Sequence, residues 1–474
     1  MQLRKWQSEC VNRALEHFDS NQRHFLCLAT PGSGKTIMAA EVAAELFKQD
    51  LIDFVLCFSP SVNISQGIQK TFSHRLECRF DGVIGSVGCS YTYQGMLSFR
   101  EDFWQLLKRN RVLVVFDEIH HCSGSNLEDS NAWGEEILLN IQEQAQYTLA
   151  LTGTPWRSDQ APIALSRYTD PDNMIQCDYI YGLKEAVIDG VCRIPQIVLI
   201  DNDKISVTDE ENKTKTYSCL DDLFKSSSIS YQSVIKNHEA IRHTLMLATN
   251  KLKVIKQNTP YAAGLIVASS TKHAVYIFNM LKTEFSETAQ IVTYKEDDPS
   301  FKINEFRNDS TNWIVSVGMI SEGTDIPRLQ VCCHLSRVKT ELYFRQVLGR
   351  ILRTNDSANQ QAWLYTFAEP KLVEFANRIA EEIPDMPVIF RTPIPINVNL
   401  PEELSIEKNE VMEDHNAPRS VRQLDWGCNY LQKPIKSNSL DAMSSNNIIN
   451  IISQSFELLG GFREKVISTF DSPF

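Results

Sequence analysis

The feature that most constrains the fold is an apolar stretch that runs directly into a loop of small residues. Phe25–Leu28 is followed by Ala-Thr-Pro-Gly-Ser-Gly-Lys-Thr at positions 29–36. This order is typical of a buried strand, a tight loop whose main-chain amides surround phosphate groups, and a helix that opens at Thr36. A strand joined to a helix in this way favours a parallel α/β sheet and predicts binding of a nucleoside triphosphate.

Within this loop, the residue types suit specific tasks. The Lys35 amine would reach the β- and γ-phosphates, and the Thr36 hydroxyl would bind Mg²⁺. Ala29 stands where a glycine is usual, so the loop alone could also be a chance match or a generic nucleotide binder. The residues predicted to bind the cofactor here are Thr30, Pro31, Gly32, Ser33, Gly34, Lys35 and Thr36.

A second apolar stretch, residues 111–116, ends in Asp-Glu-Ile-His at 117–120. A buried parallel strand that delivers two carboxylates at its carboxyl end is where an α/β sheet places ligand chemistry. Asp117 would hold Mg²⁺ through water, and Glu118 would orient and deprotonate the attacking water. The tetrapeptide alone would fit solvated acids at a strand end, but the upstream phosphate loop favours the catalytic interpretation.

With these residues, the chain resembles the DExH-box members of helicase superfamily two, whose motifs follow in order from Leu3 to Arg353. The resemblance implies that Gln7 reads the adenine edge through its amide, with support from Arg4. ATP and Mg²⁺ are then the expected cofactors. The alternative for residues 6–18 is a plain amphipathic helix whose polar residues face water.

Three short motifs of the first domain extend the resemblance. Residues 151–157 read Leu-Thr-Gly-Thr-Pro-Trp-Arg, and the hydroxyls of Thr152 and Thr154 are expected to couple the His120 segment to the nucleic-acid face. Two further segments occupy the positions of strand-gripping motifs, although each also fits a simple turn after a strand. Their predicted nucleic-acid contacts are Ser59, Pro60, Thr92, Tyr93 and Gln94.

Matching motifs follow in the second half. An apolar strand at 262–268 ends in Ser269 and Ser270, which the resemblance implies would lie at the nucleic-acid surface. A helix is expected over 272–281, and residues 313–317 form another apolar run. The segment 318–327 resembles the fifth motif of the family. There the resemblance implies a tight turn at Gly323, a phosphate contact from Thr324, and a ribose or interdomain contact from Asp325.

The sixth motif, Gln-x-x-Gly-Arg-x-x-Arg, lies within residues 343–353. On one helix, Gln346, Arg350 and Arg353 would share a face at i, i+4 and i+7. An arginine fork suits the charge that develops on a γ-phosphate, so both arginines are candidate fingers and Gln346 a water or γ-phosphate sensor. A basic, solvated helix face is the alternative, but Gly349 and Gln346 at this spacing favour the motif.

The predicted fold class is α/β, with two tandem RecA-like parallel-sheet domains and a C-terminal extension. We expect residues 201–230 to form a small insertion or mobile excursion, residues 231–258 one long helix, and residues 448–456 the start of a short amphipathic helix. The predicted divisions are a first RecA-like domain at 1–168, an interdomain connection at 169–258, a second RecA-like domain at 259–380, and an extension at 381–474 that packs as a strap or docks a partner.

Composition narrows the function classes. A net charge of −12 over 474 residues argues against bulk electrostatic adhesion to nucleic acid, but not against contacts through amides and hydroxyls. No stretch has the length of a membrane span or the form of a signal peptide, so a soluble, cytoplasmic protein without a membrane partner is expected. The twelve cysteines form no Cys-x-x-Cys pair and are expected to be reduced thiols rather than zinc ligands.

The motifs together predict an ATP hydrolase that acts as a DNA helicase or translocase, with DNA favoured over RNA as the partner. An RNA helicase is the first alternative, because these motifs grip a backbone and do not read the 2′-hydroxyl. A nucleic-acid-triggered ATPase switch within a multi-protein restriction, defence or repair complex is the second.

Overall fold

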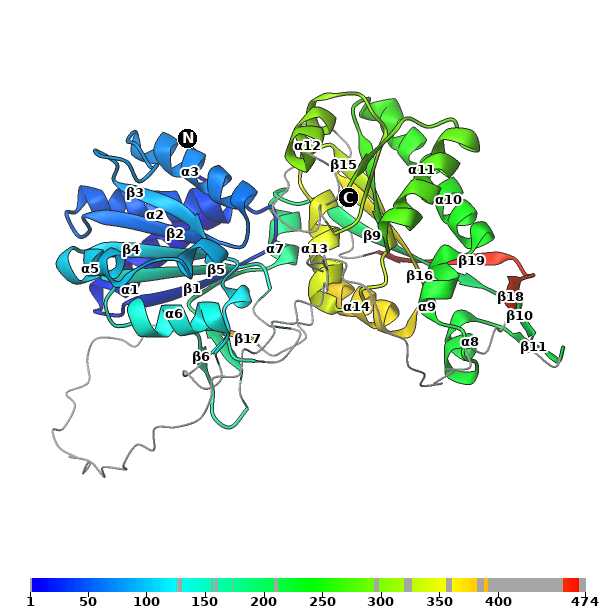
Figure 1. Cartoon of the computed structure of the whole chain (residues 1–474), viewed down its shortest axis with the longest axis horizontal. Coiled ribbons are helices and arrows are strands. Elements are labelled where there is room, and N and C mark those ends of the chain that lie inside the picture. The colour runs from blue at the N-terminus through cyan, green and yellow to red at the C-terminus, as the bar shows by residue number, and fades with distance from the viewer. Residues whose placement is uncertain are drawn as a thin grey trace, which may run out of the picture. The chain divides into compact units, whose positions relative to one another are not determined.

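The structure is a computed structural model. It describes residues 2–124, 126, 130–154, 157, 161–172, 174–208, 212–293, 298–318, 326–354, 360–381, 388–390 and 455–468. The described parts of 1–391 and 451–474 belong to one compact unit. This unit contains two large, mostly parallel sheets, which we call the sheets of the first and second lobe (Figure 1).

The first lobe is a six-stranded sheet in the order β3-β2-β4-β5-β1-β8, and every neighbouring pair is parallel. Strand β4 consists of buried residues from end to end, as expected for a parallel strand covered on both faces. Its strands are β1 (His24–Ala29), β2 (Phe54–Ser59), β3 (Gly88–Thr92), β4 (Val112–Asp117), β5 (Tyr147–Thr152) and β8 (Tyr179–Tyr181). Its helices are α1 (Lys5–Asp19), α2 (Lys35–Lys48), α3 (Val62–Leu76), α4 (Tyr93–Met96), α5 (Glu101–Arg109), α6 (Ala132–Asn140) and the 3-10 turn η1 (Ile119–His121).

The second lobe is a seven-stranded sheet in the order β13-β14-β12-β15-β16-β9-β19. Figure 1 shows α12 and α13 on one face of this sheet and α10 and α11 on the other. Its strands are β9 (Ile194–Asn202), β12 (Ala263–Ala268), β13 (Ala289–Val292), β14 (Trp313–Ser316), β15 (Leu329–Leu335), β16 (Gln361–Phe367) and β19 (Phe462–Ser468). The helices from the connection onward are α7 (Leu183–Ile188), α8 (Leu220–Ser226), α9 (Tyr231–Lys236), α10 (His238–Asn258), α11 (Thr271–Thr283), α12 (Pro299–Asn308), α13 (Glu341–Ile351) and α14 (Pro370–Ala380).

Two small sheets complete the described fold. Strands β10 (Ile205–Thr208), β11 (Thr214–Tyr217) and β18 (Ser455–Leu458) form an antiparallel sheet. Strands β6 (Arg167–Tyr168), β7 (Ile175–Cys177) and β17 (Val388–Phe390) form the other. Because β19 pairs antiparallel with β9 and β18 pairs with β10, the described end of the extension is a strap on the second lobe, one of the two alternatives.

The structure corrects several predicted boundaries. Strand β8 pairs with β1, so the first lobe continues beyond 168, and β9 belongs to the second sheet, so the connection is shorter than 169–258. The described parts of 203–230 include β10, β11 and α8, which fits a small insertion, the first of the two alternatives for this segment. Residues 455 and 456 begin a strand instead of continuing a helix, because Phe456 and Leu458 alternate with exposed residues.

The long helix predicted over 231–258 is two helices. Asn237 has an extended conformation, with ψ of 133°, and its side chain accepts a hydrogen bond from Ala240 N at 3.1 Å. Asparagine is a favoured N-cap, so this residue ends α9 and starts α10. No helix among the described residues is both long and apolar enough to cross a membrane.

Candidate active site

The phosphate loop lies between β1 and α2, as the sequence predicts. Gly32 and Gly34 have φ of 84° and 97°, a left-handed conformation that glycine adopts without a steric penalty. A Cβ atom on Gly34 would lie 2.7 Å from Gln7 Nε2. The loop conformation and its close approach to α1 therefore both require glycine at position 34.

Gln7 and Arg4 join the start of α1 to this loop. Gln7 Nε2 donates to Gly34 O at 2.9 Å, its Oε1 accepts from Arg4 N at 2.8 Å, and Arg4 Nη1 donates to Ser33 O at 2.7 Å. Gln7 is 2% exposed, whereas Arg4 lines the cavity described below. Each polar atom of an amide can make a second hydrogen bond, so the described contacts are compatible with adenine recognition by Gln7, which stays a prediction.

The two carboxylates at the end of β4 differ in backbone conformation. Asp117 ends the strand and is 8% exposed, while Glu118 has φ of 54°, an unusual conformation for a residue with a side chain. This turn brings Glu118 back to the phosphate loop. Lys35 Nζ lies 3.2 Å from Glu118 Oε1 and donates to Ala29 O at 3.2 Å, and Gly153 N donates to Glu118 Oε2 at 3.1 Å.

These surroundings move the two pKa values apart. Burial and the neighbouring Glu118 carboxylate raise the pKa of Asp117 to about 7. Burial also opposes ionisation of Glu118, but the Lys35 ammonium, the neighbouring histidines and the Gly153 N–H together outweigh it, and the pKa falls to about 2. The Asp117 carboxylate, which is costly to ionise, and Thr36 line the same cavity, and carboxylate and hydroxyl oxygens suit a hard divalent cation such as Mg²⁺.

The predicted coupling residues form a continuous polar cluster behind the carboxylates. His120 Nδ1 lies 2.9 Å from Thr152 Oγ1 and 3.5 Å from Thr154 Oγ1, and Thr152 Oγ1 donates to Thr154 O at 2.8 Å. Because the Thr152 hydroxyl proton is used in this way, we assign the proton of the 2.9 Å bond to His120 Nδ1. Burial lowers the pKa of His120 to about 3, so its ring is neutral at physiological pH.

The helix of the sixth motif is shorter than predicted. Helix α13 ends at Ile351 with Leu352 as its C-cap, so Arg353 lies beyond the helix and does not share its face at i+7. The Arg353 backbone instead forms an isolated antiparallel bridge with Cys192. Its side chain still reaches the phosphate loop, because a Cβ on Gly32 would lie 3.1 Å from Arg353 Cγ.

One cavity of about 660 Å³ brings most of these groups together. A volume of this size suits a nucleotide-sized ligand. Its lining includes Arg4, Pro31, Gly32, Gly34, Lys35, Thr36, Asp117, Glu118, His120 and Thr154 from the first lobe, and Gln346, Arg350 and Arg353 from the second.

The structure corrects part of the predicted nucleic-acid interface. Ser59 and Tyr93 are fully buried and Ser269 is almost so, and none of the three therefore presents its side chain at the described surface, where it was expected. The Tyr93 hydroxyl donates to Asp117 O at 2.8 Å, and Ser269 Oγ lies 2.9 Å from His273 Nδ1.

The other predicted contacts have varied positions. Thr92 and Ser270 cap the short helix α4 and the helix α11, each accepting a main-chain hydrogen bond with its side chain. Pro60 lines the cavity and Gln94 is exposed. Gly323, Thr324 and Asp325 lie outside the described residues.

The cavity also contains polar residues that the sequence reasoning missed. Asn63, Gln66 and Lys70 line it from α3, and Asn304 and Arg307 line it from α12. The sequence does carry a signal for the α3 residues. Asn63, Gln66 and Lys70 are polar residues at helical spacing, directly after the motif that contains Ser59.

Comparisons with known proteins agree with this geometry. Residues 1–157 match the family model described as "Type III restriction enzyme, res subunit". Over 392 residues the chain is 30% identical to an uncharacterized protein of Mycobacterium leprae, which covers 80% of this chain and 64% of that protein. The resemblance to superfamily-two helicases is confirmed. The chain is also 24% identical to a DNA 3′-5′ translocase of Sulfurisphaera tokodaii, over 75% of this chain and 80% of the relative.

Solved structures show the same fold. A fragment described as an HsdR subunit of a type I restriction enzyme from Vibrio vulnificus superposes with a TM-score of 0.54 at 18% identity, covering 82% of this chain and 68% of that chain. The type ISP restriction-modification enzyme LlaBIII bound to DNA gives a TM-score of 0.51 at 14% identity, covering 82% and 31%. The predicted α/β architecture of two RecA-like domains is therefore confirmed.

Proposed function

We propose that this chain is an ATP-dependent DNA helicase or translocase, which couples ATP hydrolysis to movement along DNA or to its remodelling. The observation that carries the proposal is the shared cavity. Lys35, Glu118, Arg350 and Arg353 all line it, which supplies a phosphate-binding cation, a general base and two candidate arginine fingers.

Lys35 and Glu118 have linked tasks in this mechanism. The loop amides and Lys35 bind the phosphates, while Thr36 and Asp117 would hold Mg²⁺, which supplies charge neutralisation at the phosphate oxygens. The Lys35 ammonium keeps the pKa of Glu118 low in the described pair. Transfer of Lys35 to the phosphates would raise that pKa and make Glu118 a better base for the attacking water.

Arg350 and Arg353 would then stabilise the charge that develops on the transferred phosphoryl group, with Gln346 sensing water or the γ-phosphate. ATP would draw the two lobes together and hydrolysis would release them. The cluster of His120, Thr152 and Thr154 would report this change to the nucleic-acid face. If each lobe holds the same strand, every cycle changes their spacing along it.

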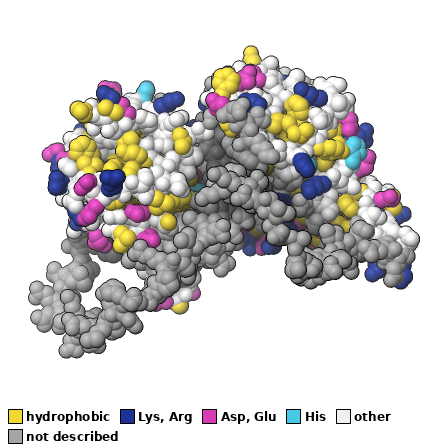
Figure 2. All heavy atoms as spheres, in the orientation of Figure 1, with side chains coloured by type: hydrophobic (Ala, Val, Ile, Leu, Met, Phe, Trp, Pro, Cys, Tyr) yellow, Lys and Arg dark blue, Asp and Glu magenta, His cyan; other side chains and the backbone are white. Residues whose placement is uncertain are grey.

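DNA is the favoured partner because one relative is named a DNA translocase and one solved neighbour is bound to DNA. On the face shown in Figure 2, lysine and arginine side chains are interspersed with acidic ones and form no single basic surface. The net charge of −12 likewise favours grip through local amides and hydroxyls over bulk charge.

A second candidate function is an ATPase motor or switch subunit of a multi-protein complex. The match of residues 1–157 to a restriction-enzyme subunit model favours it. The chain spans 64% of the length of the Mycobacterium leprae relative.

Steady-state ATPase activity tests the proposal. The protein is assayed alone and with single-stranded DNA, duplex DNA, forked DNA and RNA. Lys35→Ala serves as the inactive control, and Lys48→Ala, at the exposed end of the same helix, as the matched control. Strong stimulation by DNA that depends on Lys35 supports the proposal. Stimulation by RNA alone would favour an RNA helicase, and Lys35-dependent hydrolysis indifferent to nucleic acid would favour the switch.

A further inference from the structure

Arg193 is a fully buried arginine at the point where the connection enters the second sheet. It lies between α7 and β9, outside every motif discussed above. Its Nη1 donates to Leu329 O at 2.9 Å and to Ile351 O at 3.2 Å, and its Nη2 donates to Pro327 O at 3.1 Å. One guanidinium therefore joins two segments that are separate in sequence.

The first of these segments is the carboxyl end of α13. The last carbonyls of a helix have no partner within it, and a cation is favourable there because of the helix dipole. Arg193 supplies both a cation and donors, through the bond to Ile351 O and through its own main-chain N, which donates to Leu352 O at 2.7 Å.

The second segment is the start of β15, where the chain returns from the fifth motif. Pro327 and Leu329 accept from Arg193, and the Gln330 side chain faces the same guanidinium. With its amide oxygen turned toward Arg193, Gln330 accepts from Nε at 3.2 Å and from Nη2 at 2.9 Å. The planar fork of arginine is suited to spanning several acceptors in this way, and a lysine ammonium is not.

The residues around Arg193 also hold Arg353. Cys192 forms the antiparallel bridge with Arg353, and the Thr354 hydroxyl donates to Val191 O at 3.2 Å. Residues 191–193 therefore contact the chain directly after the end of α13. Burial lowers the pKa of Arg193 to about 10, so the group remains charged at neutral pH.

We propose that Arg193 is a positioning residue for the arginine pair, which fixes the end of α13 and thereby the point from which Arg353 reaches the bound nucleotide. The inference rests on the proposed ATPase function. It assigns a role in turnover to a fully buried residue of the interdomain connection that is not among the residues lining the cavity.

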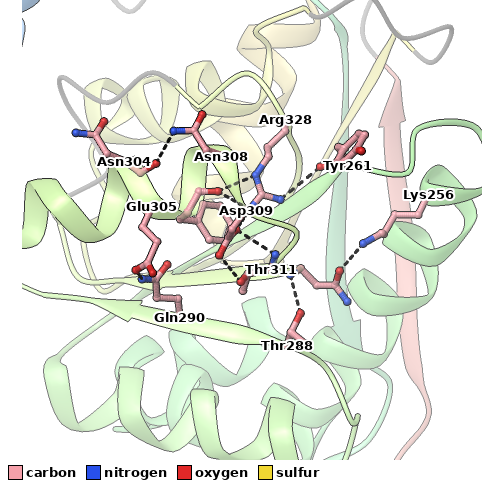
Figure 3. A network of polar contacts seen from close by, with 12 residues as sticks. Lys256, Tyr261, Thr288, Gln290, Asn304, Glu305, Asn308, Asp309, Thr311 and Arg328 are labelled. Atoms are coloured by element: carbon pink, nitrogen blue, oxygen red, sulfur yellow. Dashed lines mark hydrogen bonds and ion pairs between the residues drawn. The ribbon is translucent and has the colours of Figure 1, made fainter.

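Arg328 offers a matched control in the same lobe (Figure 3). It is also buried, at 8% exposure, and it also binds main-chain carbonyls. Its Nε donates to Phe306 O at 2.9 Å, its Nη2 pairs with Asp309 Oδ1 at 2.9 Å, and its guanidinium lies 4.0 Å from the Phe306 ring centre. Arg328 thus holds the end of α12 and not the end of α13.

The experiment compares Arg193→Lys with Arg328→Lys in the full chain. Both variants should lower the melting temperature, because each replaces a buried guanidinium, which binds several acceptors, with an ammonium that cannot reach all of them. Arg193→Lys should lower kcat of the nucleic-acid-stimulated ATPase by about 10²-fold, as expected for a misplaced catalytic group, with KM for ATP unchanged. Adding Arg193→Lys to Arg353→Ala should cause little further loss, because both changes remove the same contribution.

Hydrogen exchange supplies a readout that does not need activity. In Arg193→Lys, the amides of residues 346–354 should exchange faster, whereas in Arg328→Lys the faster exchange should lie at 306–312. If Arg193→Lys does not fold, Arg193→Gln, a neutral donor, is measured in the same way. A wild type without Lys35-dependent hydrolysis would overturn the proposed function. Wild-type kcat in Arg193→Lys, or unchanged exchange at 346–354, would overturn the positioning role.

Discussion

Tyr93 gives the sharpest test of how the structure revises the predicted nucleic-acid interface. Its side chain is fully buried, its hydroxyl donates to Asp117 O at 2.8 Å, and its ring stacks on Trp133 with centroids 5.5 Å apart. Tyr93→Phe removes the hydroxyl and keeps the ring. Loss of one buried neutral hydrogen bond, with a carbonyl left short of a partner, costs about 1–2 kcal/mol in the free energy of unfolding.

For a lobe of this size, that loss corresponds to a fall in melting temperature of about 3–6 °C. Thermal unfolding followed by circular dichroism measures it, and fluorescence anisotropy with labelled DNA measures nucleic-acid affinity, which should not change. Gln94→Ala is the matched control. The Gln94 side chain is next to Tyr93 in sequence but is exposed, so its loss should leave the melting temperature unaltered. Weaker DNA binding by Tyr93→Phe at an unchanged melting temperature would refute the structural role and restore the contact first predicted.

Three further predictions concern the catalytic base, the coupling cluster and the strap. Glu118→Gln should retain ATP binding, measured with a fluorescent nucleotide, and lose at least about 10²-fold in turnover; a wild-type rate would show that another group is the base. The lowered pKa of His120 means that the unfolded chain binds more protons below about pH 6.5, so stability should fall as the pH drops from there toward 3. His120→Asn should flatten this dependence in unfolding titrations, and an unaltered pH profile would count against a buried neutral ring. Truncation after residue 450 removes β18 and β19 and exposes the edge of β9, so it should lower the melting temperature of the second lobe while Lys465→Ala, an exposed change on β19, does not.

The sequence predicts those parts of the fold in which neighbouring residues carry the signal. The phosphate loop follows from the glycines at 32 and 34, whose left-handed backbone other residues resist, and β4 follows from an uninterrupted apolar run. The cluster of His120, Thr152 and Thr154 also lies together as expected. In each case the determining residues lie within one strand–loop–helix unit or at the ends of adjacent parallel strands.

Long-range pairing explains most of what the sequence did not reveal. Strand β18 pairs with β10, and β19 with β9, so the conformation of residues 455–468 depends on partners more than 200 residues away. The end of α13 is similar, because Arg193 bonds Ile351 O and Cys192 pairs with Arg353 just beyond the helix, and no local feature of the sequence marks these two residues as its partners. The burial of Tyr93 depends on Trp133 in another helix. Helical spacing alone predicts that Arg353 shares a face of this helix. In the structure, α13 ends at Ile351 and does not reach Arg353.

The Lys35–Glu118 pair has a consequence for how hydrolysis would be controlled. The pair is three-quarters or more buried on each side, at 8% and 25% side-chain exposure, so solvent screens it weakly. In the proposed mechanism, the phosphates of ATP would compete with Glu118 for the Lys35 ammonium, and Glu118 would become a stronger base only when the phosphates hold that ammonium. Glu118 is held in its unusual backbone conformation and bonded to Gly153 N, one residue from both coupling threonines. Binding of nucleotide would therefore free Glu118 from Lys35 and change the hydrogen bonds of the Thr152–Thr154 segment in one step. Activation of the base would then be linked to the residues proposed to report to the nucleic-acid face.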